Sequence, residues 1–302
     1  MSKLTEKINQ LKQKRNAVIL VHNYQRGEVQ DIADYTGDSL GLSMQASRTK
    51  ADLIVFCGVH FMAETAAIVN PRKAVVMPDP DAGCPMADMI TAEQLISEKK
   101  KFPKATVVTY VNSTAAVKAE SDICCTSANA VEVVRSLKDS NEILFVPDMY
   151  LGNYVSKQVP GKKFIFWNGY CPSHVAILAD DIRRLKKENP DAEVMVHPEC
   201  TPDVVALADK VLSTEGMVSH AAKSGAKKFI VGTETGILHR LSKENPGKKF
   251  VAASGKAVCP NMKLTTIEKV LWSLEEAKHK VEVPEPVRKK AEKAIKRMLA
   301  IS

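Results

Sequence analysis

The sequence predicts an α/β fold in which three similar units follow one another, each with a small parallel sheet. Three observations predict it. Strand-like and helix-like segments alternate along the chain, which is typical of parallel sheets joined by right-handed crossovers. Apolar and polar positions recur at separations of 88 and then 87 residues. Three Cys-Pro pairs keep almost the same spacing. The spacing therefore predicts a threefold repeat of units of about 87 residues.

Each unit begins with an apolar run rich in β-branched residues, as expected for a buried strand. The three runs are residues 17–21, 105–109 and 192–196. Each run ends in a polar ring, and these rings are His22, Tyr110 and His197. Two positions later the side chains are again polar: Tyr24, Asn112 and Glu199.

Two helical segments are predicted next in each unit. Short helical stretches, such as 29–35 and 204–212, carry aspartates that keep the repeat spacing: Asp34, Asp122 and Asp209. A second helix is expected over 40–49, 128–137 and 216–223, after Ser39, Ser127 and Thr214. Ser and Thr suit helix N-caps because the side-chain oxygen accepts a free backbone N–H.

A second and a third strand complete each unit. The second is predicted at 53–57, 143–147 and 228–232, and the third at 74–77, 164–167 and 250–253. Turn-forming residues at Phe102-Pro103 and Asn189-Pro190 mark the boundaries. The predicted domains are therefore 16–102, 103–190 and 191–278, with a helix over 1–15 and a basic helix over 279–302.

Length and composition agree with an ordinary globular protein. The 302 residues are 45% hydrophobic and 26% charged, which excludes disordered and collagen-like classes. Length alone would suggest about two domains. Apolar runs stay well short of the roughly 20 residues of a membrane helix. The first ten residues lack the apolar stretch of a signal peptide, so we expect a cytoplasmic protein with no membrane partner.

The net charge of +8 lies at the two ends of the chain. Residues 1–15 carry +4 and residues 278–302 carry +5, which leaves −1 for the rest. Charge runs of this kind are usually solvated helix faces. A nucleic-acid partner is therefore not expected.

The seven cysteines divide into two groups. An odd number without a secretory signal argues against a disulfide framework. Cys84, Cys171 and Cys259 follow the third strand of each unit, and each precedes a proline. The other four are expected to be buried bystanders, and they are Cys57, Cys124, Cys125 and Cys200.

The three Cys-Pro pairs suggest a metal site. In a pseudo-threefold arrangement, equivalent loops meet at the axis, so three thiolates would converge. Cys-Pro is common at iron–sulfur ligands, since proline removes an N–H and fixes the chain direction. Three thiolates without a fourth suggest a cluster with one open iron, which is a Lewis acid. Structural zinc, which usually takes four ligands, and plain burial remain alternatives.

A substrate site is expected beyond the carboxyl ends of the strands, where ligands bind in parallel α/β units. The polar residues that follow the first strands lie there: His22, Tyr24, Tyr110, Asn112, His197 and Glu199. Ser39, Ser127, Ser213 and Thr214 lie at helix starts, which suit carboxylate or phosphate. Each could also be a plain N-cap. Glu199, the one carboxylate at its repeat position, is the preferred general base.

These residues resemble the quinolinate synthase family of bacterial and archaeal NAD biosynthesis over nearly the whole chain. The resemblance rests on residues 22–25 (HNYQ), 37–39 (GDS), 58–65 (GVHFMAET), 83–89 (GCPMADM), 110–113 (YVNS), 147–148 (PD), 169–172 (GYCP), 197–200 (HPEC), 213–217 (STEGM), 232–236 (GTETG) and 259–263 (CPNMK). Ser173 departs from the family pattern, in which an apolar residue is expected.

The resemblance implies three αβα-sandwich domains around a pseudo-threefold axis. It implies one [4Fe-4S] cluster per chain, held by Cys84, Cys171 and Cys259, with one open iron. The implied reaction condenses iminoaspartate with dihydroxyacetone phosphate to quinolinate, with loss of phosphate and two waters. Iminoaspartate is short-lived in water, so an L-aspartate oxidase or an aspartate dehydrogenase is expected to supply it.

The resemblance also implies roles for single residues. Glu199 and His197 are expected to be catalytic, and Tyr24 and Tyr110 to transfer protons and gate the site. The expected substrate-binding residues are His22, Ser39, Tyr110, Asn112, Ser127, His197, Glu199, Ser213 and Thr214. An iron–sulfur redox sensor or regulatory protein is the alternative, although a sensor needs no polar substrate pocket. A phosphosugar-binding protein without a cluster would leave the Cys-Pro pairs unexplained.

Overall fold

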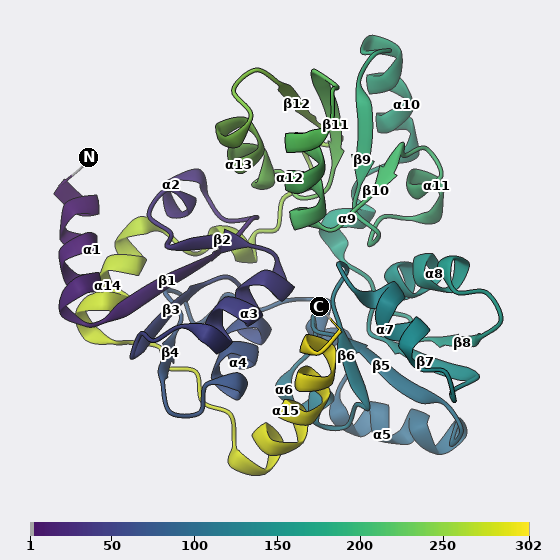
Figure 1. Ribbon diagram of the computed structural model, residues 1–302, viewed down its shortest axis with the longest axis horizontal. Coiled ribbons are helices and arrows are strands. Elements are labelled where there is room, and N and C mark those ends of the chain that lie inside the picture. The colour runs from purple at the N-terminus through teal and green to yellow at the C-terminus, as the bar shows by residue number, and fades with distance from the viewer. Residues whose placement is uncertain (1–2, 302) are drawn as a thin grey trace.

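The computed structural model describes residues 3–301 and confirms the α/β prediction. Three four-stranded sheets, each entirely parallel, have the orders β2-β1-β3-β4, β6-β5-β7-β8 and β10-β9-β11-β12. Figure 1 shows them as three lobes around a common centre. The ends of the two predicted terminal helices, residues 1, 2 and 302, lie outside the described residues.

The three units contain the same succession of elements. The first comprises β1 (Ala17–His22), α2 (Gly27–Gln30), β2 (Tyr35–Gly37), α3 (Ser39–Arg48), β3 (Leu53–Cys57), α4 (His60–Val69), β4 (Ala74–Val76) and the 3-10 helix η1 (Ala87–Met89). The second comprises β5 (Thr106–Tyr110), α6 (Ala115–Ala119), β6 (Ile123–Cys125), α7 (Ala130–Ser136), β7 (Glu142–Val146), α8 (Met149–Gln158), β8 (Lys163–Phe166) and α9 (Pro172–Val175). The third comprises β9 (Glu193–Val196), α11 (Pro202–Val205), β10 (Lys210–Val211), α12 (Thr214–Lys223), β11 (Lys228–Gly232), α13 (Ile237–Glu244), β12 (Lys249–Ala252) and the 3-10 helix η2 (Asn261–Lys263). Five further helices complete the described part of the chain: α1 (Lys3–Lys14), α5 (Ala92–Lys101), α10 (Ala179–Glu188), α14 (Ile267–Glu276) and α15 (Glu285–Leu299).

The repeated aspartates have one structural role in all three units. Their carboxylates accept the backbone N–H of a residue in the first strand, at 2.8 Å in every case: Asp34 from Ile19, Asp122 from Val107 and Asp209 from Val194. Each aspartate N–H donates back to the carbonyl of that same residue. The pair of bonds fixes the chain just before the short strand, which explains why aspartate recurs there.

Removing one of these carboxylates is expected to destabilise the fold. Asp122→Ala leaves the N–H of Val107 without its partner, at a cost of about 1–2 kcal/mol in the free energy of unfolding. Urea unfolding measures the change. Asp139→Ala, at an exposed position of the same unit, is the control and should change stability by less than about 0.5 kcal/mol. Equal effects of the two substitutions would contradict this role.

The short strands β2, β6 and β10 were not expected from the sequence. Helical stretches were predicted over 29–35 and 204–212, but α2 ends at Gln30 and α11 ends at Val205. β2 then begins at Tyr35 and β10 at Lys210. These strands have only two or three residues, which is too short for an alternating pattern to be visible. Each unit therefore has four strands instead of three.

One helix that packs on each sheet follows the Cys-Pro loop of the neighbouring unit. The first unit supplies this helix to the second sheet, the second unit to the third sheet, and the third unit to the first sheet. Leu95 of α5 packs with Val107 and Leu144 of the second sheet. In the same way, α10 packs on the third sheet, and α14 packs on the first sheet, which closes the ring. The Cys-Pro loops precede these helices, so each loop runs between neighbouring units. The boundaries at 102/103 and 190/191 remain predictions, because α5 and α10 lie with the sheet that follows them.

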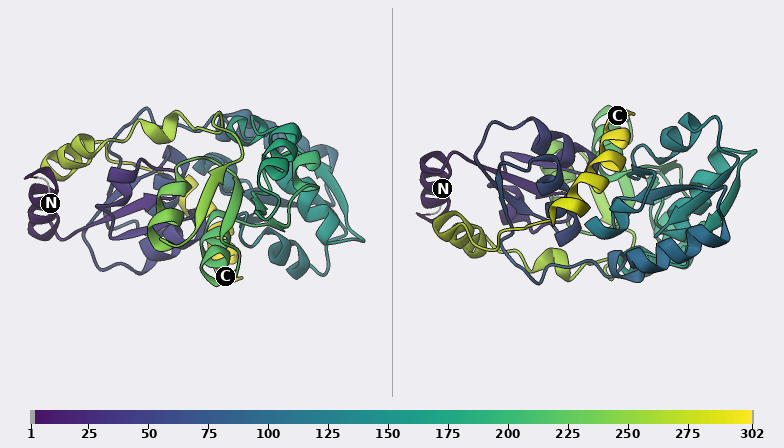
Figure 2. Two further views of the ribbon diagram at one scale, coloured as in Figure 1. Left: turned by 90° about the horizontal axis from the view of Figure 1, so that it is seen from above. Right: turned by 90° about the horizontal axis from the view of Figure 1, so that it is seen from below.

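The basic terminal helices have both an apolar and a charged face. In α1, Ile8 is buried against α14. The helix α15 packs against α4, α6 and β6, and so joins the first two units (Figure 2). Its Ile295 is buried, whereas the side chains of Lys289, Lys290 and Lys296 are 63–68% exposed. The charge of these lysines therefore lies on a solvated face, as expected. Among residues 3–301, none of the helices combines the length and the apolar character needed to span a membrane.

Candidate functional site

One cavity receives side chains from all three units. The space between its lining side chains, including the part that is open to solvent, is about 650 Å³. It is lined by every predicted site residue except Ser213: His22, Tyr24, Ser39, Cys84, Tyr110, Asn112, Ser127, Cys171, His197, Glu199, Thr214 and Cys259. Most of these side chains follow the carboxyl ends of strands, since that is where the repeat places them.

The serines and threonines divide into caps and cavity-lining residues. Ser213 is the N-cap of α12, and its hydroxyl accepts the N–H of Gly216 at 3.1 Å. Asp38 caps α3 in the same way. The N-caps were thus predicted one residue too late, because Ser39 and Thr214 are the first helical residues. Ser127 precedes α7, whose N-cap position is Asn129.

The three Cys-Pro cysteines differ from the other four. All seven are free, but Cys84, Cys171 and Cys259 are partly exposed while the others are buried, as expected. Burial raises the pKa of the Cys84 thiol to about 12 and raises the pKa values of the Cys171 and Cys259 thiols as well. Opposing this, the nearby backbone N–H groups of Ala87, His174 and Met262, each three residues later, lower the pKa of the respective thiol.

This environment fits an iron–sulfur cluster. A thiol with a raised pKa becomes a ligand only when a cationic group stabilises the thiolate, as bound iron does. Backbone N–H groups directed at sulfur are among the contacts that tune such clusters. A single ion is a weaker fit. Ligand atoms of Cys171, His174 and Glu199 lie within 4.8 Å of one another, but an ion there would use only one of the repeated cysteines.

Glu199 is buried among proton donors and acceptors. The Tyr110 hydroxyl donates to its Oε1, and Nδ1 of His174 lies 2.9 Å from its Oε2. Burial alone would raise the pKa of this carboxyl, but His174, His197 and the Tyr110 hydroxyl outweigh burial and lower it to about 2. Glu199 is therefore an ionised carboxylate inside the cavity.

The two histidines at equivalent repeat positions share one geometry. Nδ1 of His22 accepts the N–H of Tyr24 at 3.1 Å, and Nδ1 of His197 accepts the N–H of Glu199 at 3.4 Å. Burial lowers both pKa values to about 3, so the rings are neutral. A neutral ring that accepts at Nδ1 carries its proton on Nε2. In His197 this atom lies 3.0 Å from Oγ of Ser127.

A chain of polar contacts leads from Tyr24 to Glu199. The Tyr24 hydroxyl lies 2.5 Å from Oγ1 of Thr233, which lies 2.8 Å from Nε2 of His174. The other nitrogen of that ring faces Glu199. Burial, reinforced by Glu199, raises the pKa values of Tyr24 and Tyr110, so both phenols stay protonated. Hydrogen bonds therefore link Tyr24 to His174, and the last step to Glu199 is a close approach of Nδ1 without hydrogen-bond geometry.

Sequence reasoning missed His174, Thr233, Glu234 and Asp148. Asp148 and Glu234 follow β7 and β11 at equivalent positions, so the ends of the second long strands could have revealed them. Glu234 is fully buried, accepts the N–H of Cys259 at 3.2 Å and pairs with Lys263 at 2.9 Å. It therefore anchors one cysteine loop. His174 comes three residues after Cys171, where the other units have the apolar Ala87 and Met262.

Known proteins resemble this chain over nearly its whole length. A family model described as "Quinolinate synthetase A protein" matches residues 6–300. Three similar proteins are named quinolinate synthase. That of Geobacter metallireducens is 58% identical over 298 residues, covering 99% of this chain and 97% of its own. That of Dehalococcoides mccartyi is 58% identical and covers 99% and 98%, and that of Methanosarcina barkeri is 56% identical and covers 99% and 98%.

Proposed function

We infer that this chain, which belongs to the quinolinate synthetase A protein family, catalyses the quinolinate synthase reaction in the cavity between its three units. The observation that carries the inference is the meeting of three Cys-Pro thiols with an ionised, buried Glu199 in one cavity. The sensor alternative has no support in these comparisons, and a polar cavity built from three units is the arrangement that a substrate requires.

We propose that Cys84, Cys171 and Cys259 hold a [4Fe-4S] cluster. Their free thiols, their place in the cavity lining and the backbone N–H groups that lower the pKa of each thiol support this ligand set. When bound, such a cluster with three protein ligands supplies an open iron that acts as a Lewis acid. The remaining chemistry falls to the side chains of the chain.

The proposed substrates are iminoaspartate and dihydroxyacetone phosphate, which together carry two carboxylates and a phosphate. Hydroxyls of Ser39, Ser127 and Thr214 and the Nε2–H of His22 are the proposed donors to these anions. Ser39 and Thr214 also begin helices, whose free N–H groups favour negative charge. Oδ1 of Asn112 is buried without a hydrogen-bond partner among the described residues, so it is available to a ligand N–H or O–H. Ser213 would act indirectly, as the cap of α12.

Glu199 is the proposed base. Condensation removes a proton from the carbon of iminoaspartate that attacks its partner, and the Glu199 carboxylate can accept this proton. The two waters leave as hydroxyl groups that must be protonated. Tyr110 and the path from Tyr24 through Thr233 and His174 can deliver those protons. His197 holds the Ser127 side chain beside this base.

The proposed reaction also implies a source of iminoaspartate and a cellular compartment. The short lifetime of iminoaspartate requires a producing enzyme, an L-aspartate oxidase or an aspartate dehydrogenase. We place the reaction in the cytoplasm, where free thiols such as the seven of this chain persist.

An anaerobic assay tests the proposed function. Cluster-loaded protein, supplied with dihydroxyacetone phosphate and enzymatically generated iminoaspartate, is expected to form quinolinate, measured by chromatography. Protein without the cluster is the control and should form none. Absence of quinolinate with fully loaded protein would contradict the proposed function.

A further inference from the structure

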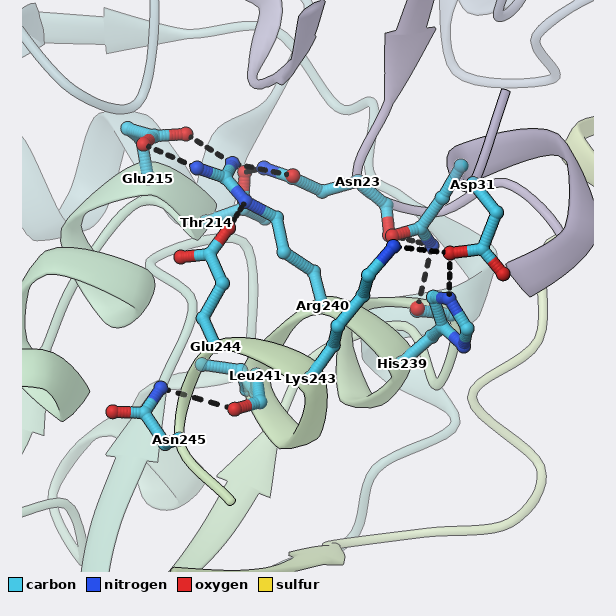
Figure 3. A network of polar contacts seen from close by, with 12 residues as sticks. Asn23, Asp31, Thr214, Glu215, His239, Arg240, Leu241, Lys243, Glu244 and Asn245 are labelled. Atoms are coloured by element: carbon cyan, nitrogen blue, oxygen red, sulfur yellow. Dashed lines mark hydrogen bonds and ion pairs between the residues drawn. The ribbon is translucent and has the colours of Figure 1, made fainter. Parts of the chain in front are cut away.

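A polar network joins the first and third units beside the cavity (Figure 3). Its centre is Arg240 of α13, whose side chain is 16% exposed. Two guanidinium nitrogens donate to the carboxylate of Glu215 at 2.7 and 3.1 Å, and Nε donates to Glu244 at 2.7 Å. One of the two nitrogens bonded to Glu215 also donates to Oδ1 of Asn23 at 3.0 Å. Three partners therefore hold the guanidinium group in one orientation.

This contact fixes the orientation of the Asn23 amide. A guanidinium group can only donate hydrogen bonds, so the atom that faces Arg240 must be the amide oxygen. The amide nitrogen then points the other way and donates to Oγ1 of Thr214 at 2.9 Å. Asn23 is fully buried, and its backbone is bonded to Gly37 and Gln30. It has little freedom to turn.

The bond from Asn23 keeps the proton of the Thr214 hydroxyl from pointing toward Asn23. Its oxygen accepts from Asn23, and within residues 3–301 its own O–H has no acceptor. Thr214 lines the cavity and begins α12, so the free O–H is available to a ligand there. The repeat positions equivalent to Asn23 are Val111 and Pro198, whose side chains cannot donate. Within the described part of the chain, this arrangement of Arg240, Asn23 and Thr214 therefore occurs at the junction of the first and third units alone.

We propose that Arg240 and Asn23 are positioning residues, which turn the Thr214 hydroxyl so that its proton meets an anionic group of the substrate. The proposal rests on the proposed function, since it assumes an anionic ligand in this cavity. It assigns a role in substrate affinity to an arginine that lies outside the cavity lining.

The same junction contains a second set of contacts that supplies a matched control. Asp31 of the first unit accepts from Lys243 at 2.5 Å and lies 3.0 Å from Nε2 of His239 (Figure 3). Lys243 and Arg240 both lie on α13, but the Lys243 contact does not reach Asn23 or Thr214. If Arg240 only joined the two units, Lys243→Met and Arg240→Met would have similar consequences.

A double-variant comparison tests the proposal. Binding of dihydroxyacetone phosphate and of quinolinate to the cluster-loaded protein is measured by anaerobic calorimetry. Arg240→Met and Asn23→Ala are each expected to raise the Kd of at least one probe roughly tenfold, the effect of losing an oriented hydrogen bond to a charged group. Arg240→Lys should have a smaller effect, and Lys243→Met should leave both Kd values within about twofold.

Repeating the Arg240→Met and Asn23→Ala substitutions in a Thr214→Val variant tests whether they act through the Thr214 hydroxyl. There the hydroxyl is absent, so Arg240→Met and Asn23→Ala should cause no further weakening. Weakening by the same factor in this background, or equal weakening by Lys243→Met, would overturn the proposal. Thermal unfolding of each variant separates loss of fold from loss of affinity. Because the readout is binding instead of turnover, failure of this test and failure of the quinolinate assay are separate results.

Discussion

Replacing any one of Cys84, Cys171 and Cys259 with alanine is expected to abolish the iron–sulfur cluster. In the proposed site each cysteine supplies one of three equivalent ligands, and the cavity offers no spare thiol among the described residues. A cluster with two remaining thiolates would lose one bond to iron. It would also lose one of the negative charges that balance the positive charge of the iron in the cavity. The measurement is iron and sulfide content after anaerobic reconstitution, for which the parent protein should give about four irons per chain.

Cys124→Ala is the matched control for this series. Cys124 is fully buried in the hydrophobic core and lies outside the cavity lining, so its variant should keep the full iron content. Far-ultraviolet circular dichroism of all four variants verifies that they fold. Full iron content in any one of the three Cys-Pro variants would contradict the ligand assignment.

Glu199→Gln is expected to lower kcat by about 10²–10⁴-fold, the usual contribution of a general base. The amide keeps the size of the side chain, and its oxygen still accepts from Tyr110, but it cannot take a proton. Iron content should stay unchanged, which separates this effect from loss of the cluster. The measurement is the steady-state rate of quinolinate formation.

The control for Glu199 is Glu193→Gln. Glu193 begins β9, contacts His220 and Ser224 and is not among the described residues that line the cavity, so its variant should keep the parent rate within about twofold. A Glu199→Gln variant that also stays within a few-fold of the parent rate would show that Glu199 is not the base.

The fold was predictable because the repeat shows in the sequence at positions where the same residue type has the same structural role in each unit. Asp34, Asp122 and Asp209 recur because each ties the chain to a first strand. The long strands were visible as apolar runs, whereas β2 and β10 contain too few residues to show a pattern. The packing of α5, α10 and α14 on the next sheet was also hidden, since an amphipathic helix does not specify which sheet it covers.

The candidate site was predictable where it follows the first strands and the Cys-Pro pairs. His174 escaped because its repeat counterparts are apolar, and Thr233 because its function appears only through its contacts with Tyr24 and His174. Arg240 could not have been found from the sequence. Its contact with Asn23 spans 217 residues, and its position on α13 resembles that of any exposed arginine.

We expect the iron–sulfur cluster and the substrate to share one cavity, and Mössbauer spectroscopy of ⁵⁷Fe-loaded protein can show whether they do. Spectra are recorded with and without quinolinate, at a concentration that calorimetry shows to be saturating. If three thiols hold the cluster and the fourth iron faces the cavity, roughly a quarter of the iron signal should change on binding while the rest stays constant. A spectrum unaltered by bound quinolinate would contradict a shared cavity for the cluster and the substrate.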